Sequence, residues 1–406
     1  MSFFKKTSHV STDAVQIQEL ITRGVERVFP SGEFLEKKLK SGERLTIYHG
    51  IDPTGKTLHI GHAVPLLKLA QFQKLGHRII LLVGDFTARI GDPTDKMAAR
   101  VPLTEEQVRE NAKEYKKQAG SIIAFGGANP AVLRYNSEWL KKLSAADTYK
   151  LLSEVTYAQT IKRDMFQKRL AEGRDLFLHE FLYPILQGYD SVALDVDGEV
   201  GGNDQTFNML MGRDLMKRMR QKEKFVIAVK LLVDAEGKKM GKTEGNMVSF
   251  LDSPADCFGK IMSWPDGMIL TGLELCTLIP TSDIETMKRQ LEEGTNPKEV
   301  KMKLAEAVVS LLHGEAEAKK ARTGFNAAFT EGKPEEFLEI SVSETITVGE
   351  ALVVQKVVES KSDLRRLIGE KAVTNLGTGE KMGEDFLKTA PAGKYRIGKH
   401  RFIEIK

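Results

Sequence analysis

The stretch Leu45-Thr-Ile-Tyr-His-Gly-Ile-Asp-Pro-Thr-Gly-Lys-Thr-Leu-His-Ile-Gly-His62 predicts a strand, a tight turn and the start of a helix. Apolar residues flank Tyr48, turn-forming residues follow, and an apolar run with helical spacing continues from Val64 to Phe72. His59 and His62 then share one face of the first helical turn, where unpaired backbone N–H groups and the helix dipole favour a polyphosphate. The alternative is a polar helix cap with one buried histidine, and these four residues alone do not exclude it.

A second apolar segment, Arg78–Gly84, ends in glycine, as buried parallel strands commonly do. Together with the preceding strand and helix it makes a strand–helix–strand unit. This unit predicts an α/β fold built on a Rossmann-like, doubly wound parallel sheet. Ligands bind such sheets at the carboxyl ends of the strands, where the turn from Asp85 to Lys96 is expected.

The segments around the sheet are expected to be helical. Apolar residues at near-helical spacing predict one amphipathic helix over residues 12–29. Helical patterns over 104–119 and 137–172 predict a helical insertion of about 104–180 between the two halves of the sheet.

The apolar helix that follows carries three polar side chains, Tyr183, Gln187 and Asp190, spaced four and three residues apart. This spacing places them on one face. A core tyrosine with a capping aspartate is one interpretation. Because buried polar groups need partners, a bound amino acid is the other.

Two glycine-rich segments come next. In Val200–Gln205 a pair of glycines before a helix allows a ligand to approach the backbone closely. The segment Asp234–Asn246 combines three lysines with three glycines, and mobile cationic loops often close over phosphates. A solvated hairpin tip is the alternative for this lysine loop.

The C-terminal third changes character. From Pro254 to about Leu338 the pattern is helical, and beyond it a capping box at Thr347 and Glu350 begins a small separate region that ends in strand-like pieces. Basic residues concentrate in this region. They suit an RNA backbone, although a solvated charged surface is the alternative.

Composition limits the possible functions. The chain has 406 residues, 41% of them hydrophobic and 29% charged, and a formal net charge of +4, so a polyanion would have to bind local basic faces. Cys257 and Cys276 lack metal-ligand spacing, which argues against zinc and favours a reducing compartment. No segment has the length and apolarity of a membrane span, and a cytoplasmic location without membrane contact is expected.

Taken together, the motifs closely resemble the class I aminoacyl-tRNA synthetases, and within that class the bacterial tyrosyl-tRNA synthetase family. The resemblance implies three parts. They are a Rossmann-like catalytic domain over 1–230, a helical tRNA-binding domain with the lysine loop over 231–335, and a small α+β RNA-binding module of ribosomal-protein type over 345–406. The motifs that carry the resemblance are Tyr48, His59-Ile-Gly-His62, Asp92, the Tyr183/Gln187/Asp190 triple, Gly201-Gly-Asn-Asp-Gln205, Lys239-Met-Gly-Lys-Thr243 and Ser360-Lys-Ser-Asp-Leu-Arg-Arg-Leu-Ile368.

The resemblance also implies a role for each matching residue. Tyr48 and Asp190 would bond the phenol of tyrosine, and Asp92, Tyr183 and Gln187 would hold its α-ammonium group. Gly50, Asp52 and Gln205 complete the tyrosine-binding set. The catalytic set is His59, His62, Thr54, Lys96, Arg100, Lys239 and Lys242, the ATP-binding set is Asp52, His59, Gly61, His62, Gly202, Asp204, Met240 and Lys242, and the RNA-binding set is Lys361, Arg365, Arg366 and Lys371.

The implied reaction joins tyrosine to the terminal adenosine of tRNA(Tyr) after activation by ATP. Mg²⁺ would accompany ATP without a dedicated protein site, and the family implies a homodimer. Departures from the family pattern are Gly241 and Thr243 in place of serines, Asn203 in place of serine or threonine, and His49 in place of cysteine. They leave individual ribose contacts open. The alternatives are a synthetase-like RNA-binding protein without activation and a class I enzyme for another amino acid.

Overall fold

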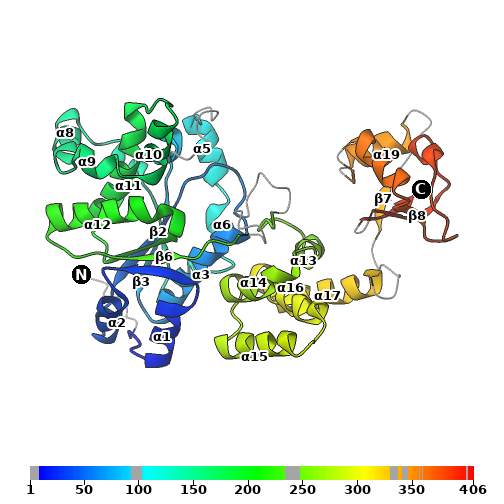
Figure 1. The fold of residues 1–406 in the computed structure, drawn as a ribbon, viewed down its shortest axis with the longest axis horizontal. Coiled ribbons are helices and arrows are strands. Elements are labelled where there is room, and N and C mark those ends of the chain that lie inside the picture. Colours follow the sequence, from blue (N-terminus) through cyan, green and yellow to red (C-terminus); the bar gives the residue numbers. More distant parts are fainter. Residues whose placement is uncertain are drawn as a thin grey trace. The chain divides into compact units, whose positions relative to one another are not determined.

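The chain divides into two compact units, one made of residues 1–253 and 260–315, the other of 254–259 and 316–406. The first unit contains the large sheet, and the second contains a small one (Figure 1). The three-part division expected from the sequence stays a prediction. The computed structural model describes residues 9–92, 103–233, 247–329, 337–340, 346–355, 357–358, 360–398 and 401–406.

The described strands of the first unit pair in the order β1-β6-β5-β2-β3-β4. Neighbours are parallel except at the edge, where β1 runs antiparallel to β6. Because the strand order extends in both directions from β2, the predicted doubly wound, Rossmann-like sheet is confirmed. The strands are β1 Val25–Phe29, β2 Thr46–Ile51, β3 Arg78–Val83, β4 Val132–Tyr135, β5 Gly198–Gly202 and β6 Phe225–Val229.

Helices cover both faces of this sheet, as alternate residues of β6 show. Phe225 stacks on Phe72 of helix α3 with ring centroids 6.0 Å apart, whereas Val226 and Ala228 pack with Met209 of helix α12 on the other face. Helix α11 packs along α12 (Figure 1). These helices are α3 Ile60–Lys74, α11 Leu178–Leu194 and α12 Thr206–Arg220, and the 3₁₀ turn η2 Asn203–Gln205 precedes α12.

The single helix expected over residues 12–29 is wrong in its second half. Helix α1, Ala14–Thr22, ends before Gly24, whose φ of +63° is a conformation that other residues rarely adopt. The β-branched Val25 and Val28 then continue as strand β1. The segment therefore supplies the antiparallel edge of the sheet, and helix α2, Gly32–Lys40, follows it.

The region 104–180 is mainly helical, but it also supplies a strand that the sequence pattern did not indicate. Strand β4 pairs in parallel with β3, so a purely helical insertion is wrong at this point. Four residues are too few to establish an alternating pattern. The helices here are α5 Glu105–Ala112, α6 Tyr115–Ala119, α7 Ser137–Leu140, α8 Ala145–Ser153, α9 Tyr157–Thr160 and α10 Asp164–Ala171, and α4 Thr87–Ile90 precedes them.

The segment that follows Pro254 is helical, as predicted. Val308 and Val309 are among its buried residues, which agrees with the expected core positions. The elements are α13 Pro254–Met262, η4 Asp266–Met268, α14 Ile269–Cys276, α15 Thr281–Glu292, α16 Pro297–His313 and α17 Glu315–Phe329.

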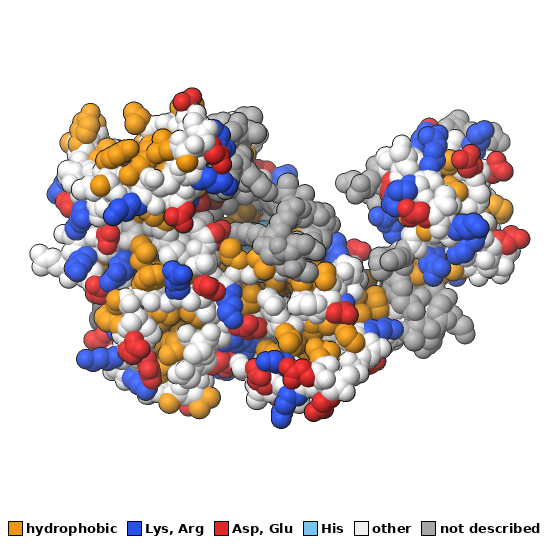
Figure 2. All heavy atoms as spheres, in the orientation of Figure 1, with side chains coloured by type: hydrophobic (Ala, Val, Ile, Leu, Met, Phe, Trp, Pro, Cys, Tyr) orange, Lys and Arg blue, Asp and Glu red, His pale blue; other side chains and the backbone are white. Residues whose placement is uncertain are grey.

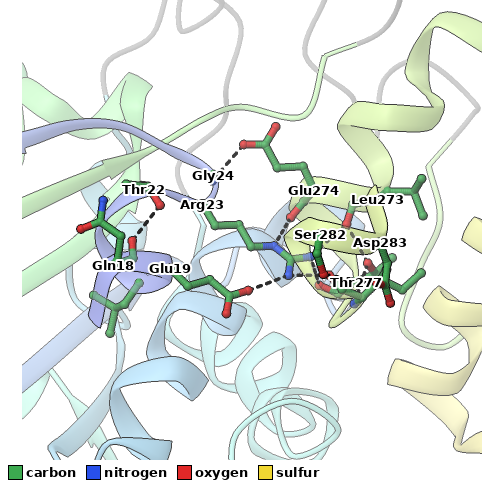
Figure 3. Close-up of polar contacts among 12 residues, drawn as sticks. Gln18, Glu19, Thr22, Arg23, Gly24, Leu273, Glu274, Thr277, Ser282 and Asp283 are labelled. Atoms are coloured by element: carbon green, nitrogen blue, oxygen red, sulfur yellow. Dashed lines mark hydrogen bonds and ion pairs between the residues drawn. The ribbon is translucent and has the colours of Figure 1, made fainter. Parts of the chain in front are cut away.

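Arg23 joins the α1–β1 junction to the carboxyl end of helix α14 (Figure 3). Its guanidinium donates to the backbone carbonyls of Leu273, Glu274, Thr277 and Ile279 at 2.7–3.1 Å, and to the carboxylate of Glu19 at 3.1 Å. All five N–H donors of this side chain are thereby used. A cation at the end of a helix, where carbonyls lack intrahelical partners, is electrostatically favourable.

The small sheet of the second unit has the order β7-β10-β9-β8 and packs against two helices. The capping box predicted at Thr347 and Glu350 is present, and the helix it begins ends at Val354. The elements are β7 Leu338–Ile340, α18 Val348–Val354, α19 Lys361–Gly369, β8 Val373–Asn375, η5 Glu384–Leu387, β9 Gly393–Ile397 and β10 Arg401–Ile405.

Candidate active site

A cavity of about 1270 Å³ opens at the carboxyl ends of the parallel strands of the first unit. The lysine loop residues Lys239, Met240 and Lys242, together with Lys96 and Arg100, lie outside the described residues. All other residues expected to bind tyrosine or ATP or to assist catalysis line this cavity: Tyr48, Gly50, Asp52, Thr54, His59, Gly61, His62, Asp92, Tyr183, Gln187, Asp190, Gly202, Asp204 and Gln205.

The two histidines form the start of helix α3. His59 is the N-cap, and its Nδ1 accepts the backbone N–H of Gly61 at 3.2 Å, while Nδ1 of His62 accepts the N–H of His59 at 3.1 Å. The helix cap of the alternative interpretation is therefore present. Because each Nδ1 is an acceptor, a neutral ring carries its proton on Nε2, which is then a donor. The cap thus orients two donors beside the positive end of the helix dipole.

The helix start is also held by the chain that follows the lysine loop. Ile60 N–H donates to the carbonyl of Val248 at 2.9 Å, and His59 forms a β-bridge with Ser249. The residues shortly after the lysine loop are therefore hydrogen-bonded to the start of helix α3.

Tyr48 and Asp190 are buried and line the same cavity, and we call this part of its lining the amino-acid end. Tyr48 Oη is 2.9 Å from Ser191 Oγ, whereas the carboxylate of Asp190 accepts from Trp139 Nε1 at 2.8 Å and Asn136 Nδ2 at 3.2 Å. Burial raises the pKa of Tyr48 well above its ordinary value, and the charges of Glu199 and Asp190 add to this effect. Burial also raises the pKa of Asp190, against the two donors.

Tyr183 is hydrogen-bonded to Asp52, another residue of the expected tyrosine-binding set. Its hydroxyl donates to Asp52 at 2.8 Å, and Thr87 Oγ1 donates to the other oxygen of Asp52 at 2.8 Å. Burial raises the pKa of Asp52 to about 7, although both donors lower it. Gly84 leaves room for this group, since a Cβ there would lie 1.9 Å from Asp52 Oδ1. The structure therefore joins Tyr183 to the turn that follows strand β2, and its role in holding the ammonium group stays a prediction.

Asp92 is held by a buried polar network. It pairs with Arg163 at 2.8 Å, and Gln205 Nε2 donates to its second oxygen at 2.8 Å. Asn208 Nδ2 lies between Gln205 and Gln187, 2.9 Å from the amide oxygen of each. The expected ammonium-binding residues Asp92 and Gln187 are thus connected through two amides.

The nucleotide side of strand β5 is shaped by glycine. A Cβ at Gly201 would lie 2.8 Å from Met209 Sδ, and one at Gly202 would lie 2.5 Å from Asp204 Oδ1. His49 Nδ1 is 2.8 Å from the carbonyl of Val200, and burial lowers the pKa of this histidine. Its Nδ1 is therefore the protonated nitrogen, committed to the backbone.

Several residues of the site have no signal in the sequence pattern. They are Asn136, Arg163, Ser191, Glu199, Asn208 and Lys224, which come from different elements and meet only in the fold. Asn208 is the partial exception, because it lies one helical turn after Gln205 and shares its face.

The expected RNA-binding residues lie on the exposed surface of helix α19 and just after it. Lys361 pairs with Glu350, and Arg366 pairs with Asp363 and Glu370, so acidic side chains intersperse with the basic ones (Figure 2). Arg365 and Lys371 are exposed as well. Within the described ranges, no cluster of side chains that could hold a metal ion is found, and no helix has the length and apolarity to cross a membrane.

Comparison with known proteins agrees with this site. Residues 40–330 match the model of the class I tRNA synthetases for tryptophan and tyrosine. The tyrosine–tRNA ligase of Carboxydothermus hydrogenoformans is 42% identical over 404 residues, covering 95% of this chain and 97% of that protein, and tyrosine–tRNA ligase 2 of Vibrio cholerae is 41% identical over 392 residues, with coverage of 95% and 97%. A C-terminally truncated mitochondrial tyrosyl-tRNA synthetase of Coccidioides posadasii is similar in structure, with a TM-score of 0.63 at 26% identity, over 76% of this chain and 91% of that one.

The sheet, the histidines at the helix start and the match over residues 40–330 thus define a class I tRNA synthetase. Within that class, the chain belongs to the tyrosine–tRNA ligase family.

Proposed function

We propose that this protein activates L-tyrosine with ATP and transfers it to the 3′-terminal adenosine of tRNA(Tyr). The observation that carries the proposal is one cavity lined by two different sets of groups. One set, which we call the phosphate end, consists of helix-start donors suited to phosphate, and the other, the amino-acid end, includes a buried hydroxyl and carboxylate suited to a phenol.

In the first step an oxygen of the tyrosine carboxylate attacks the α-phosphorus of ATP. The bond to pyrophosphate breaks, and tyrosyl-adenylate forms. The protein supplies no nucleophile, so its contribution is positioning and stabilisation of the charge that develops on phosphate oxygens. Nε2 of His59 and of His62 are the groups with the right chemistry, and Thr54, Gly61, Gly202 and Asp204 line the same end.

The phenol of tyrosine fits the other end. Tyr48 can donate to its oxygen, and Asp190 can accept its proton. A phenyl ring without the hydroxyl would form neither hydrogen bond. Asp92, Asp52, Tyr183 and Gln187 provide the negative charge and the acceptors that a desolvated ammonium group requires. In this proposal Lys96, Arg100, Lys239, Met240 and Lys242 complete the phosphate end.

Mg²⁺ would enter with ATP, bound chiefly by phosphate oxygens. The second step passes the tyrosyl group to tRNA, and Lys361, Arg365, Arg366 and Lys371 of the second unit would contact phosphates of the tRNA body. Because such contacts release counterions, we expect tRNA affinity to fall steeply with salt. We propose that the reaction takes place in the cytoplasm.

A homodimer is part of the proposal. Exposed aromatic and aliphatic side chains gather over helices α8 to α10 (Figure 2), among them Tyr149, Tyr157 and Leu170. Contiguous apolar surface of this kind is typical of protein interfaces. Sedimentation analysis should give a dimer for the wild-type chain and a shift towards monomer for Leu170→Asp with Tyr157→Asp.

The deciding experiment is tyrosine-dependent exchange of pyrophosphate into ATP, run with and without EDTA. We expect exchange with tyrosine, little with phenylalanine or tryptophan, and none once Mg²⁺ is chelated. A folded protein that binds tRNA but gives no exchange would instead support an RNA-binding role without activation.

A further inference from the structure

Lys224 lies behind the amino-acid end of the cavity and is completely buried. It forms an ion pair with Glu199, itself buried, and its Nζ is 2.8 Å from Ser191 Oγ. Nζ also lies 5.7 Å from the centre of the Tyr48 ring. A buried cation directly behind a substrate-facing tyrosine requires an explanation.

The packing of α11 and α12 makes room for this lysine. A Cβ at Gly212 of α12 would lie 2.7 Å from both Lys224 Nζ and Ser191 Oγ. A Cβ at Gly188 of α11 would lie 3.1 Å from the backbone nitrogen of Gly212. Two glycines therefore let the helices approach closely and leave a space that the ammonium group fills.

A contribution to stability does not explain why this ion pair is present. Replacing a buried ion pair with apolar residues of similar size is often neutral or stabilising, because desolvation offsets the attraction. Unlike an apolar group, an ammonium group fixes the donor-to-acceptor direction of the hydrogen bonds around it, because it has three donors and no acceptor.

The donor-to-acceptor direction is the same along the hydrogen bonds from Lys224 to Ser191 and from Ser191 to Tyr48. Because Lys224 can only donate, Ser191 Oγ must accept from it. The hydroxyl hydrogen of Ser191 is then available for Tyr48 Oη, 2.9 Å away, which is the acceptor that the described contacts of Ser191 offer. With its oxygen accepting from Ser191, Tyr48 turns its own O–H away from Ser191 and towards Glu199, Asp190 and the cavity, and Glu199 is a hydrogen-bond acceptor for it.

We propose that Lys224 and Ser191 are positioning residues that make Tyr48 a hydrogen-bond donor to the substrate. This inference rests on the proposed activation of tyrosine. A phenol oxygen then accepts from Tyr48, and the phenol hydrogen points to Asp190. An amino acid without the hydroxyl offers no acceptor to the directed O–H of Tyr48, so the relay adds to the discrimination between tyrosine and phenylalanine.

The test is a double-mutant cycle that joins Ser191→Ala with Tyr48→Phe, read as the ratio of kcat/KM for tyrosine and phenylalanine in pyrophosphate exchange. Ser191→Ala should lower this ratio about tenfold, through KM for tyrosine more than through kcat. In the Tyr48→Phe background the same change should alter the ratio by less than about twofold, because the group it orients is gone.

The matched control is Thr277→Val. Thr277 carries a buried hydroxyl that donates to the carbonyl of Leu273 at 2.6 Å, away from the cavity lining. It should cost similar stability and leave the ratio unchanged. Lys224→Met combined with Glu199→Gln removes the ion pair without leaving an unpaired charge, and it should reproduce the loss seen for Ser191→Ala.

The outcomes distinguish the proposed relay from the proposed activation of tyrosine. Additive effects of Ser191→Ala and Tyr48→Phe, or a wild-type ratio in folded Ser191→Ala, would overturn the relay while leaving tyrosine activation intact. Absence of tyrosine-dependent exchange in the wild-type protein would overturn both.

Discussion

The two ends of the cavity are built in different ways. The two histidines of the phosphate end are local, because they, their cap and the helix dipole all come from the first turn of α3. The amino-acid end is assembled from four separate segments, which contribute Tyr48, Asp190 with Ser191, Glu199 and Lys224. Its groups are buried and hydrogen-bonded to neighbouring side chains. The histidine pair thus depends on one turn of helix, whereas selection among amino acids depends on how several elements pack.

The largest expected effect is at the phosphate end. His59→Asn keeps an oxygen that can cap the helix but removes the Nε2 donor, so pyrophosphate exchange should fall by about 10²-fold or more with stability nearly unchanged. His59→Ala should lose the same activity and about 1 kcal/mol of stability besides. Equal activity of His59→Asn and the wild type would show that this histidine only caps the helix. The phosphate end would then lose its proposed donor at His59.

Tyr48→Phe should give the next effect, at the amino-acid end. We expect kcat/KM for tyrosine to fall about 10- to 100-fold while that for phenylalanine changes little, since only tyrosine loses a hydrogen bond. Tyr115→Phe is the control, because that buried hydroxyl donates to the carbonyl of Gly55 and does not line the cavity. A parallel loss for both amino acids would mean that Tyr48 supports the fold without selecting the substrate.

Asp52 lies between the two ends and should make tyrosine binding depend on pH. With its pKa raised to about 7, the carboxylate is protonated below that pH and no longer attracts an ammonium group. KM for tyrosine should therefore rise towards tenfold per pH unit as the pH falls below about 7. Thr87→Val removes a donor that lowers this pKa, so the midpoint should move up, and a fixed midpoint would exclude Asp52 as the titrating group.

The smallest effect concerns Lys68, a second buried lysine, on the helix of the phosphate end. Its Nζ donates to the carbonyls of Leu20 and Arg23 at 2.6 and 2.8 Å, and burial lowers its pKa to about 7. Between this value and the unfolded value near 10.5 the unfolded chain binds the extra proton, so stability should rise with pH over that window. The slope is at most about 1.4 kcal/mol per pH unit.

Denaturant unfolding at several pH values between 7 and 10 measures this slope. Lys68→Met should flatten it, whereas Lys74→Met, which changes an exposed lysine of the same helix, should not. An unchanged slope in Lys68→Met would show that Lys68 titrates normally in the folded chain.

Features that depend on residues close together in the chain can be predicted from the sequence. The helix start at His59, the shared face of Tyr183, Gln187 and Asp190, and the capping box at Thr347 depend on spacing over a few residues, and the structure contains all three. Apolar spacing over residues 12–29 does not distinguish a helix from the strand β1 that follows Gly24, and the glycine marks the break.

Other parts of the site have no local cause. Lys224 looks like an ordinary surface residue at the start of a strand, and only the close packing at Gly188 and Gly212 makes it a buried group beside Ser191. Arg163 likewise meets Asp92 across 71 residues of chain. Contacts of this kind depend on how elements pack, which spacing along one segment does not encode.

The guanidinium of Arg23 has a mechanical consequence. It binds two carbonyls of helix α14 and two of the residues that follow the helix. Glu274 of α14 accepts from the backbone N–H of Gly24 and from Nζ of Lys230, a residue that lines the cavity. A rotation of α14 must therefore either break several hydrogen bonds at once or carry the cavity rim with it. Arg23 therefore couples the position of helix α14 to the position of the cavity rim.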